Sequence, residues 1–247
     1  MTDYSVYVMG TKQKMLYILA AAAVIFAAGF LFYRNVLISV LLTPLALLYP
    51  GIKAKDLVKR RKKELNIQFK DLLYSLASSV SAGKSIESAF RAALEDLSVL
   101  YPEPSTYILA EIRNIISRLD TNETLESALT EFAGRAGLED LDNFVNVLSI
   151  SKRTGGNIAQ IIRNASSIIS DRIEVGQEID MLLAERRFEQ KVLNAVPVFM
   201  IALLSASAPD YMYPIFNTAA GRLTMTIALA MMVLAWFISA KLNDIKV

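Results

Sequence analysis

The chain has 247 residues, of which 54% are hydrophobic and 20% are charged, with a formal net charge of +2 and a mean hydropathy of +0.39. This is too apolar for an ordinary soluble domain, whose apolar share is about 45–50% even with glycine counted, and too charged for a chain wholly in lipid. The sequence has no cysteine and no histidine. Their absence excludes disulfides, the usual zinc sites, haem histidine ligands and Ser-His-Asp or Cys-His nucleophiles.

Two apolar stretches near the N-terminus predict a transmembrane helical hairpin over residues 1–52. Residues 15–33 are long enough to cross a hydrocarbon core of roughly 30 Å. Arg34 and Asn35 then form a short turn before a second span at residues 36–52, whose Pro44 a helix bundle tolerates. A signal peptide is an alternative for the first stretch, although its apolar run exceeds the usual length of about 7–15 residues.

A strongly basic segment follows the second span. It comprises Lys53, Lys55, Lys59, Arg60, Arg61, Lys62 and Lys63. Because the segment directly follows a span, we expect it to contact anionic lipid headgroups, where each cation is worth about 1 kcal/mol. Nucleic-acid binding is the alternative, but residues 64–191 are acidic overall and would repel a polyphosphate.

Residues 53–191 predict a cytoplasmic bundle of six helices, and no alternating strand pattern competes. The helices carry apolar stripes that begin at Leu65, Ile86, Ile108, Leu125, Leu141 and Ile158. Their expected stops are Gly83, Pro102, Pro104, Gly155 and Gly156, and the expected N-terminal caps are Ser85, Thr124 and Asn157. The last helix measures roughly 51 Å over residues 158–191, and we expect it to continue into the third span without a break.

The C-terminal region, residues 192–247, predicts a second transmembrane hairpin with spans at residues 192–208 and 223–239. A loop joins them and contains Pro209, Asp210, Pro214 and Gly221. Lysine and arginine gather beside the other span ends, including Lys246, whereas only Arg34 and Arg222 lie on the opposite side. The positive-inside rule therefore places both termini and residues 53–191 in the cytoplasm.

Two six-residue segments repeat one pattern, Ser85–Phe90 and Thr124–Leu129. Each has a hydroxyl residue, an apolar residue, an identical Glu-Ser-Ala and a second apolar residue. A hydroxyl cap followed by glutamate satisfies free amides and suits the helix dipole, so good helix starts explain the local chemistry.

The sequence resembles the type II secretion system F domain over roughly residues 65–205. The resemblance rests on these two segments and on Thr154-Gly155-Gly156-Asn157-Ile158 before a long helix. The later Ala184-Glu185-Arg186-Arg187, Pro197 and Ala208–Met212 resemble the TadB-like branch of tight-adherence (Flp-type) pili. One departure is the turn at Asp120–Glu123, where the family often has glycine. Asn122 tolerates the left-handed backbone that such a turn needs.

The resemblance implies a non-enzymatic inner-membrane platform protein that couples a cytoplasmic assembly ATPase to pilin insertion or extraction. It also implies a TadC-like F-domain paralogue, pilin subunits and an oligomer as partners, with no cofactor. Candidate partner-contacting residues are Glu87, Glu126, Asp140, Asp142, Arg153, Gly155, Gly156, Glu185, Arg186 and Arg187. Each also suits a solvated helix end or loop, and interfacial anchoring equally explains the two arginines near the third span.

Two other classes of protein remain as alternatives, a membrane transporter or self-contained scaffold and a membrane enzyme. A transporter usually keeps ionisable residues within its spans, and Asp, Glu, Lys and Arg are absent from these four. An enzyme would need a reactive group near the membrane surface, and the candidate on the outer side is Asp210 with Tyr211 and Tyr213. An ordinary structured loop explains these residues as well. The sequence predicts no catalytic or metal site, and it leaves open an adhesive pilus, a secretion pseudopilus or a DNA-uptake fibre.

Overall fold

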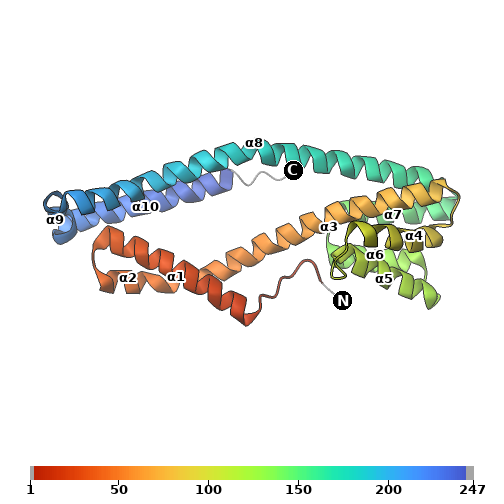
Figure 1. The fold of residues 1–247 in the computed structure, drawn as a ribbon, viewed down its shortest axis with the longest axis horizontal. Coiled ribbons are helices and arrows are strands. Elements are labelled where there is room, and N and C mark those ends of the chain that lie inside the picture. Colours follow the sequence, from red (N-terminus) through yellow and green to blue (C-terminus); the bar gives the residue numbers. More distant parts are fainter. Residues whose placement is uncertain (1–2, 243–247) are drawn as a thin grey trace. The chain divides into compact units, whose positions relative to one another are not determined.

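The computed structural model describes residues 3–242, and every regular element in that range is helical (Figure 1). The elements are α1 Thr11–Tyr33, α2 Val36–Leu42, the 3-10 helix η1 Thr43–Leu48, α3 Tyr49–Ser81, α4 Ile86–Leu100, α5 Tyr107–Asp120, α6 Leu125–Ala136, α7 Glu139–Thr154, α8 Ile158–Ser207, α9 Pro209–Asn217 and α10 Ala219–Leu242. The all-helical prediction is confirmed. Lys246 and the predicted cytoplasmic C-terminus lie outside the described residues.

The chain divides into two compact units. We call residues 3–8 and 54–175 the bundle unit, and residues 9–53 and 176–242 the membrane unit. Helices α3 and α8 each begin in one unit and end in the other. The predicted continuation of the last bundle helix is confirmed, because α8 runs unbroken for 50 residues and contains Pro197.

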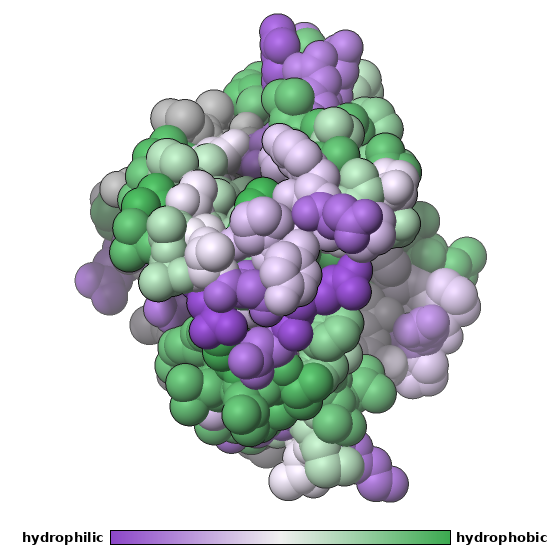
Figure 2. Space-filling view, turned by 90° about the vertical axis from the view of Figure 1, so that its left-hand side faces the viewer, coloured by the Kyte–Doolittle hydropathy of each residue, from purple (hydrophilic) through white to green (hydrophobic). Residues whose placement is uncertain are grey.

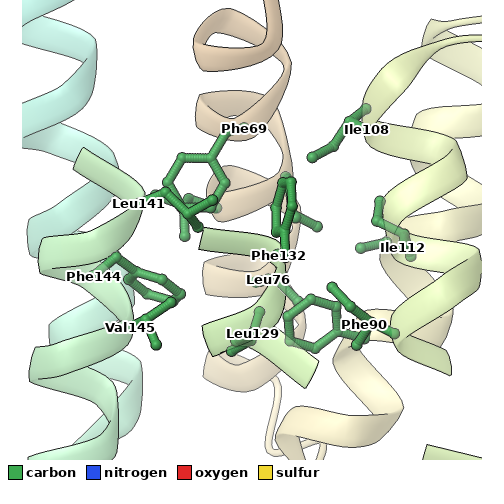
Figure 3. Packing of buried hydrophobic residues seen from close by; sticks show 14 of the residues in the cluster. Phe69, Leu76, Phe90, Ile108, Ile112, Leu129, Phe132, Leu141, Phe144 and Val145 are labelled. Carbon is green, nitrogen blue, oxygen red and sulfur yellow. The ribbon is translucent and has the colours of Figure 1, made fainter. Parts of the chain in front are cut away.

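The core of the bundle unit forms where the predicted apolar stripes meet (Figure 3). Phe69 of α3, Phe90 of α4 and Phe132 of α6 are each at most 1% exposed. Phe69 also packs edge-on against Phe144 of α7, with ring centroids 5.7 Å apart. Burial of such aromatic side chains supplies much of the free energy that holds a helical bundle together.

Local polar chemistry sets the helix ends, as the sequence predicts. The side-chain oxygens of Ser85, Thr124 and Asn157 accept hydrogen bonds from backbone amides three residues later, at 3.2, 3.3 and 3.1 Å. Asn122 adopts the expected left-handed backbone, with φ of +62°. The three predicted caps are therefore confirmed.

Among the described residues, four helical segments are long and apolar enough to cross a membrane, and the membrane unit contains or shares each of them. Its large apolar side chains point outward, including Leu19, Leu37 and Phe237. An apolar surface of this kind marks contact with lipid or another protein. Inside the unit, Phe32, Met212, Phe216 and Met225 form a small core.

The structure differs from the sequence prediction at two places in the membrane unit. The second span is not one regular helix, because α2 gives way to η1 at Thr43, just before Pro44, whose ring cannot continue the α-helical hydrogen bonding. The expected loop after Ala208 is the short helix α9, so that prediction was wrong. Pro209 suits the first position of a helix, and Met212 and Phe216, four residues apart, bury one face.

Candidate partner-binding end of the helical bundle

Three turns lie at one end of the bundle unit because its successive helices alternate in direction. We call residues 82–85, 121–124 and 155–157 together the three-turn end. Three side-chain contacts tie its helices to one another. Arg91 of α4 pairs with Asp120 of α5. The Lys152 ammonium lies 3.0 Å from a Glu126 oxygen, and Arg163 of α8 donates to the Ser81 hydroxyl at 2.7 Å.

Both repeated segments begin at this end. Glu87 and Glu126 occupy the first turns of α4 and α6, directly after their hydroxyl caps. Partial burial opposes ionisation of Glu126, but a backbone amide and the nearby Lys152 and Arg153 outweigh it and lower the pKa of this carboxyl. Glu126 therefore links α6 to α7 through Lys152. Glu87, the corresponding glutamate of the first segment, is half-buried.

The Gly155-Gly156 turn closes the same end. Gly155 follows α7 with φ of +72°, in the left-handed region that glycine enters at little cost. At Gly156 a side chain would collide with Ser151. Arg153, in the last turn of α7, is exposed beside them.

Asp140 and Asp142 lie in the first turn of α7, at the opposite end of the bundle unit. Asp140 accepts hydrogen bonds from Arg172 of α8 at 2.7 Å and Asn66 of α3 at 3.2 Å. Its carboxylate therefore joins three helices, whereas Asp142 is exposed.

The last three candidates, Glu185, Arg186 and Arg187, are exposed on α8 in the membrane unit. Arg186 pairs with Glu189 at 3.2 Å, and Arg187 lies 3.6 Å from a carboxylate oxygen of Asp180. The candidate residues therefore lie in three places: the three-turn end, the opposite end of the bundle unit, and the part of α8 in the membrane unit.

Two cations of the basic segment contact other parts of the bundle unit. The Arg61 guanidinium lies over the rings of Tyr7 and Tyr107, 4.8 and 5.6 Å from their centroids. The Lys62 ammonium donates to the Gly137 carbonyl at 2.9 Å. Exposed positions in the segment are Lys55, Lys59, Arg60 and Lys63, with Lys53 half-buried. Lipid contact stays a prediction for all seven cations of the segment.

The structure adds a buried polar cluster that the sequence analysis missed. Tyr4 is 1% exposed, and its hydroxyl donates to Glu111 Oε1 at 2.9 Å. Arg135 donates to both oxygens of that carboxylate, at 2.7 and 2.5 Å, while the Tyr4 amide donates to the Arg135 carbonyl at 3.1 Å. These bonds attach residues 3–8 to α5 and α6. In the sequence Tyr4 is simply a tyrosine before the first span. Its position does not indicate that it contacts Glu111 or Arg135.

Burial, reinforced by the Glu111 carboxylate, raises the pKa of the Tyr4 phenol. The hydrogen bond to Glu111 raises the pKa of Arg135 despite its partial burial. The cluster is therefore a neutral phenol beside a charged pair, an arrangement that binds the N-terminal segment in place.

The family model for protein F of the type II secretion system matches residues 72–206. That range is more than half of the chain and includes the whole three-turn end. The chain belongs to the type II secretion system protein F family. No curated protein and no solved structure matched it.

Protein F family membership makes this chain a multi-pass inner-membrane platform protein of secretion or pilus machinery. Members of the family are membrane platforms rather than enzymes, and they generally interact with ATPases and other components of the machinery. The matched range begins at Leu72, so the first two spans and the Tyr4 segment lie outside it.

Proposed function

We propose that this protein F relative is the platform subunit of a tight-adherence (Flp-type) pilus or related secretion machine. It couples a cytoplasmic assembly ATPase to the insertion or extraction of pilin. The observation that carries the proposal is the three-turn end, where both repeated segments and the Gly155-Gly156 turn lie on one end of the family-matched bundle. This end is where we place the ATPase contact.

The two continuous helices, α3 and α8, support the coupling role. Each belongs to the bundle unit over one part of its length and to the membrane unit over the other. In this proposal a displacement of the bundle travels to the spans along these two helices. Glu185, Arg186 and Arg187 lie on this path along α8.

We further propose a TadC-like paralogue as the partner platform subunit, because a single F domain is matched in this chain. The two proteins form a hetero-oligomer that receives pilin among its spans. Both termini and the bundle unit face the cytoplasm in this arrangement, as the distribution of lysine and arginine predicts.

A cytoplasm-specific reporter fused near Leu100 tests the orientation. We expect an active fusion, because Leu100 ends α4 in the bundle unit. A silent fusion that is stably made in the membrane would place the bundle outside and rule out contact with a cytoplasmic ATPase.

Affinity purification of the tagged, detergent-solubilised protein from its native host tests the partners. We expect mass spectrometry to find a secretion ATPase and a second F-domain protein. Glu87→Lys should reduce ATPase recovery severalfold, whereas the matched control Glu95→Lys, also on α4 but away from its first turn, should not. Equal recovery from both variants would move the ATPase contact away from the three-turn end.

Charge reversal tests the transmission path. Arg186→Glu with Arg187→Glu should reduce pilus assembly without lowering the amount of protein in the membrane. Normal assembly in this variant would remove the two arginines from the path and leave the platform assignment intact.

A further inference from the structure

A cavity of about 390 Å³ lies within the membrane unit, at the end that carries α9 and the turn between α1 and α2. Its lining comprises Tyr33, Arg34, Asn35, Ser205, Pro209, Met212, Tyr213, Phe216, Asn217 and Arg222. Figure 2 looks onto this end and shows hydrophilic residues gathered in its middle, with hydrophobic residues beside them. The cavity thus has both polar and apolar lining residues at the end of the apolar spans.

Two arginines supply the charge of the cavity. Arg34 donates from Nη2 to the Ser205 carbonyl at 3.2 Å and lies over the Phe216 ring, 5.9 Å from its centroid. Arg222 donates from Nε to the Phe216 carbonyl at 3.0 Å. Phe216 thus contacts both guanidinium groups. Each guanidinium has five N–H donors, so one such bond apiece leaves donors for a ligand.

No carboxylate balances these charges within the cavity. All ten lining residues belong to the described part of the chain, and none of them is acidic. Two cations held together without a counter-charge attract an anion, and the low dielectric near the spans strengthens that attraction.

Ser205 provides an independent sign of a missing ligand. The residue is 6% exposed, and its hydroxyl oxygen has no hydrogen-bond partner among the described residues. A buried hydroxyl without a partner costs free energy, and a ligand oxygen in the cavity would supply one.

We propose that this cavity binds the phosphate of a membrane phospholipid headgroup. Arg34 directly follows the first span, and Arg222 lies in the first turn of α10, so both stand at the depth where headgroup phosphates lie. Two of the lining residues, Tyr33 and Tyr213, are of the type enriched at membrane interfaces. Arginine pairs well with phosphate because its planar donors match the phosphate oxygens. The bound lipid holds α1, α9 and α10 together.

The test titrates phosphatidylglycerol into the full-length protein in an uncharged detergent, with bound lipid counted by native mass spectrometry. Arg34→Gln and Arg222→Gln should each weaken binding about tenfold, the effect expected from losing one charge-assisted hydrogen bond. Ser205→Ala leaves both arginine-carbonyl bonds in place and should weaken binding about threefold. The matched control is Lys12→Gln, which removes a cation from the opposite end of α1.

Diacylglycerol with the same acyl chains separates phosphate recognition from general lipid contact, and we expect it to bind at least tenfold more weakly. Circular dichroism and size-exclusion chromatography establish that each variant is folded. Phosphatidylglycerol binding that is unchanged in the folded arginine variants, or matched by diacylglycerol, would overturn the proposal. Displacement of the lipid by inorganic phosphate or acetate at equal concentration would also overturn it, and would assign the cavity to a free anion or a protein carboxylate.

Discussion

Tyr4, Glu111 and Arg135 show how three side chains fix a segment that has no regular structure. Glu111 is 4% exposed, and a buried carboxylate is costly unless it is paired and hydrogen-bonded. Arg135 supplies the charge and Tyr4 another donor, so the N-terminal segment completes the set of partners that Glu111 needs. Loss of any one member therefore weakens the attachment of residues 3–8.

The Tyr4 phenol should make the free energy of unfolding fall at alkaline pH. Its pKa is raised in the folded chain, so its contribution is full below the unfolded value of about 10 and is lost as the pH rises beyond it. Thermal unfolding of the full chain in detergent should show this alkaline decline, and Tyr4→Phe should reduce it while costing about 1–2 kcal/mol at neutral pH. The control is Tyr74→Phe at an exposed position. Identical alkaline profiles in the wild type and Tyr4→Phe would contradict the prediction.

Two glycines of the bundle unit should respond to alanine in opposite directions. Gly155→Ala should destabilise by about 1 kcal/mol, because φ is +72° there and an alanine is strained in that region. Gly134 lies inside α6 with open space around it, so Gly134→Ala should stabilise by about 0.5–1 kcal/mol. Thermal unfolding midpoints measure both changes. A stabilising Gly155→Ala would show that this turn is not held in its left-handed form.

At the scale of elements, the close approach of α1 and α2 depends on small residues. A side chain on Gly29 would lie 3.1 Å from the Cα of Ser39, and both residues are buried. Small residues permit such backbone contacts between membrane helices, where water provides no hydrophobic drive. Gly29 of the first span therefore permits the close packing of α1 against α2.

Gly29→Leu should separate these two helices and destabilise the membrane unit by about 1–3 kcal/mol, the usual cost of overpacking. The control is Gly51→Leu, because nothing lies within 4 Å of a side chain added there. Size-exclusion chromatography of detergent extracts, combined with heating, measures the difference. Equal melting of the two variants would mean that α1 and α2 adjust without loss.

At the scale of the whole molecule, the 50-residue helix α8 contributes residues to both units. Its bundle part supplies Ile162 and Ile169 to the core, and its membrane part supplies Ser205 to the cavity that Arg34 and Arg222 line. One helix thus takes part in the folding of both units. The proposed coupling requires α8 to remain helical across the boundary near Gly176.

Gln177→Pro should interrupt α8 at that boundary. Proline removes a helix hydrogen bond and costs about 3 kcal/mol in a helix interior. We expect lost pilus assembly with normal membrane insertion, measured by surface pilin and by the protein in the membrane fraction. The control Gln177→Ala should assemble normally. Full assembly in Gln177→Pro would show that coupling does not travel through α8.

The sequence by itself determined the helices of the bundle unit, three of their caps and the four apolar stretches, but not α9 or the change to η1 at Thr43. The features that it determined have local signals in the sequence. Helices show a periodicity of 3.6 residues, helix starts show a hydroxyl residue or asparagine, and spans show an uncharged run of sufficient length. Each signal depends only on residues that are near one another in the chain. Thr124 and Asn157 could therefore be assigned as caps, and α8 as continuous. The Glu-Ser-Ala repeat and the Gly-Gly turn likewise pointed to the family.

Only the tertiary structure decided which of these residues share a place. It separated Asp140 from Glu126, turned Arg61 and Lys62 toward the bundle, buried Tyr4 against Glu111 and gathered Arg34, Ser205 and Arg222 around one cavity. The members of these groups lie far apart in the chain, and their contacts depend on helix directions and close packing that local spacing does not encode.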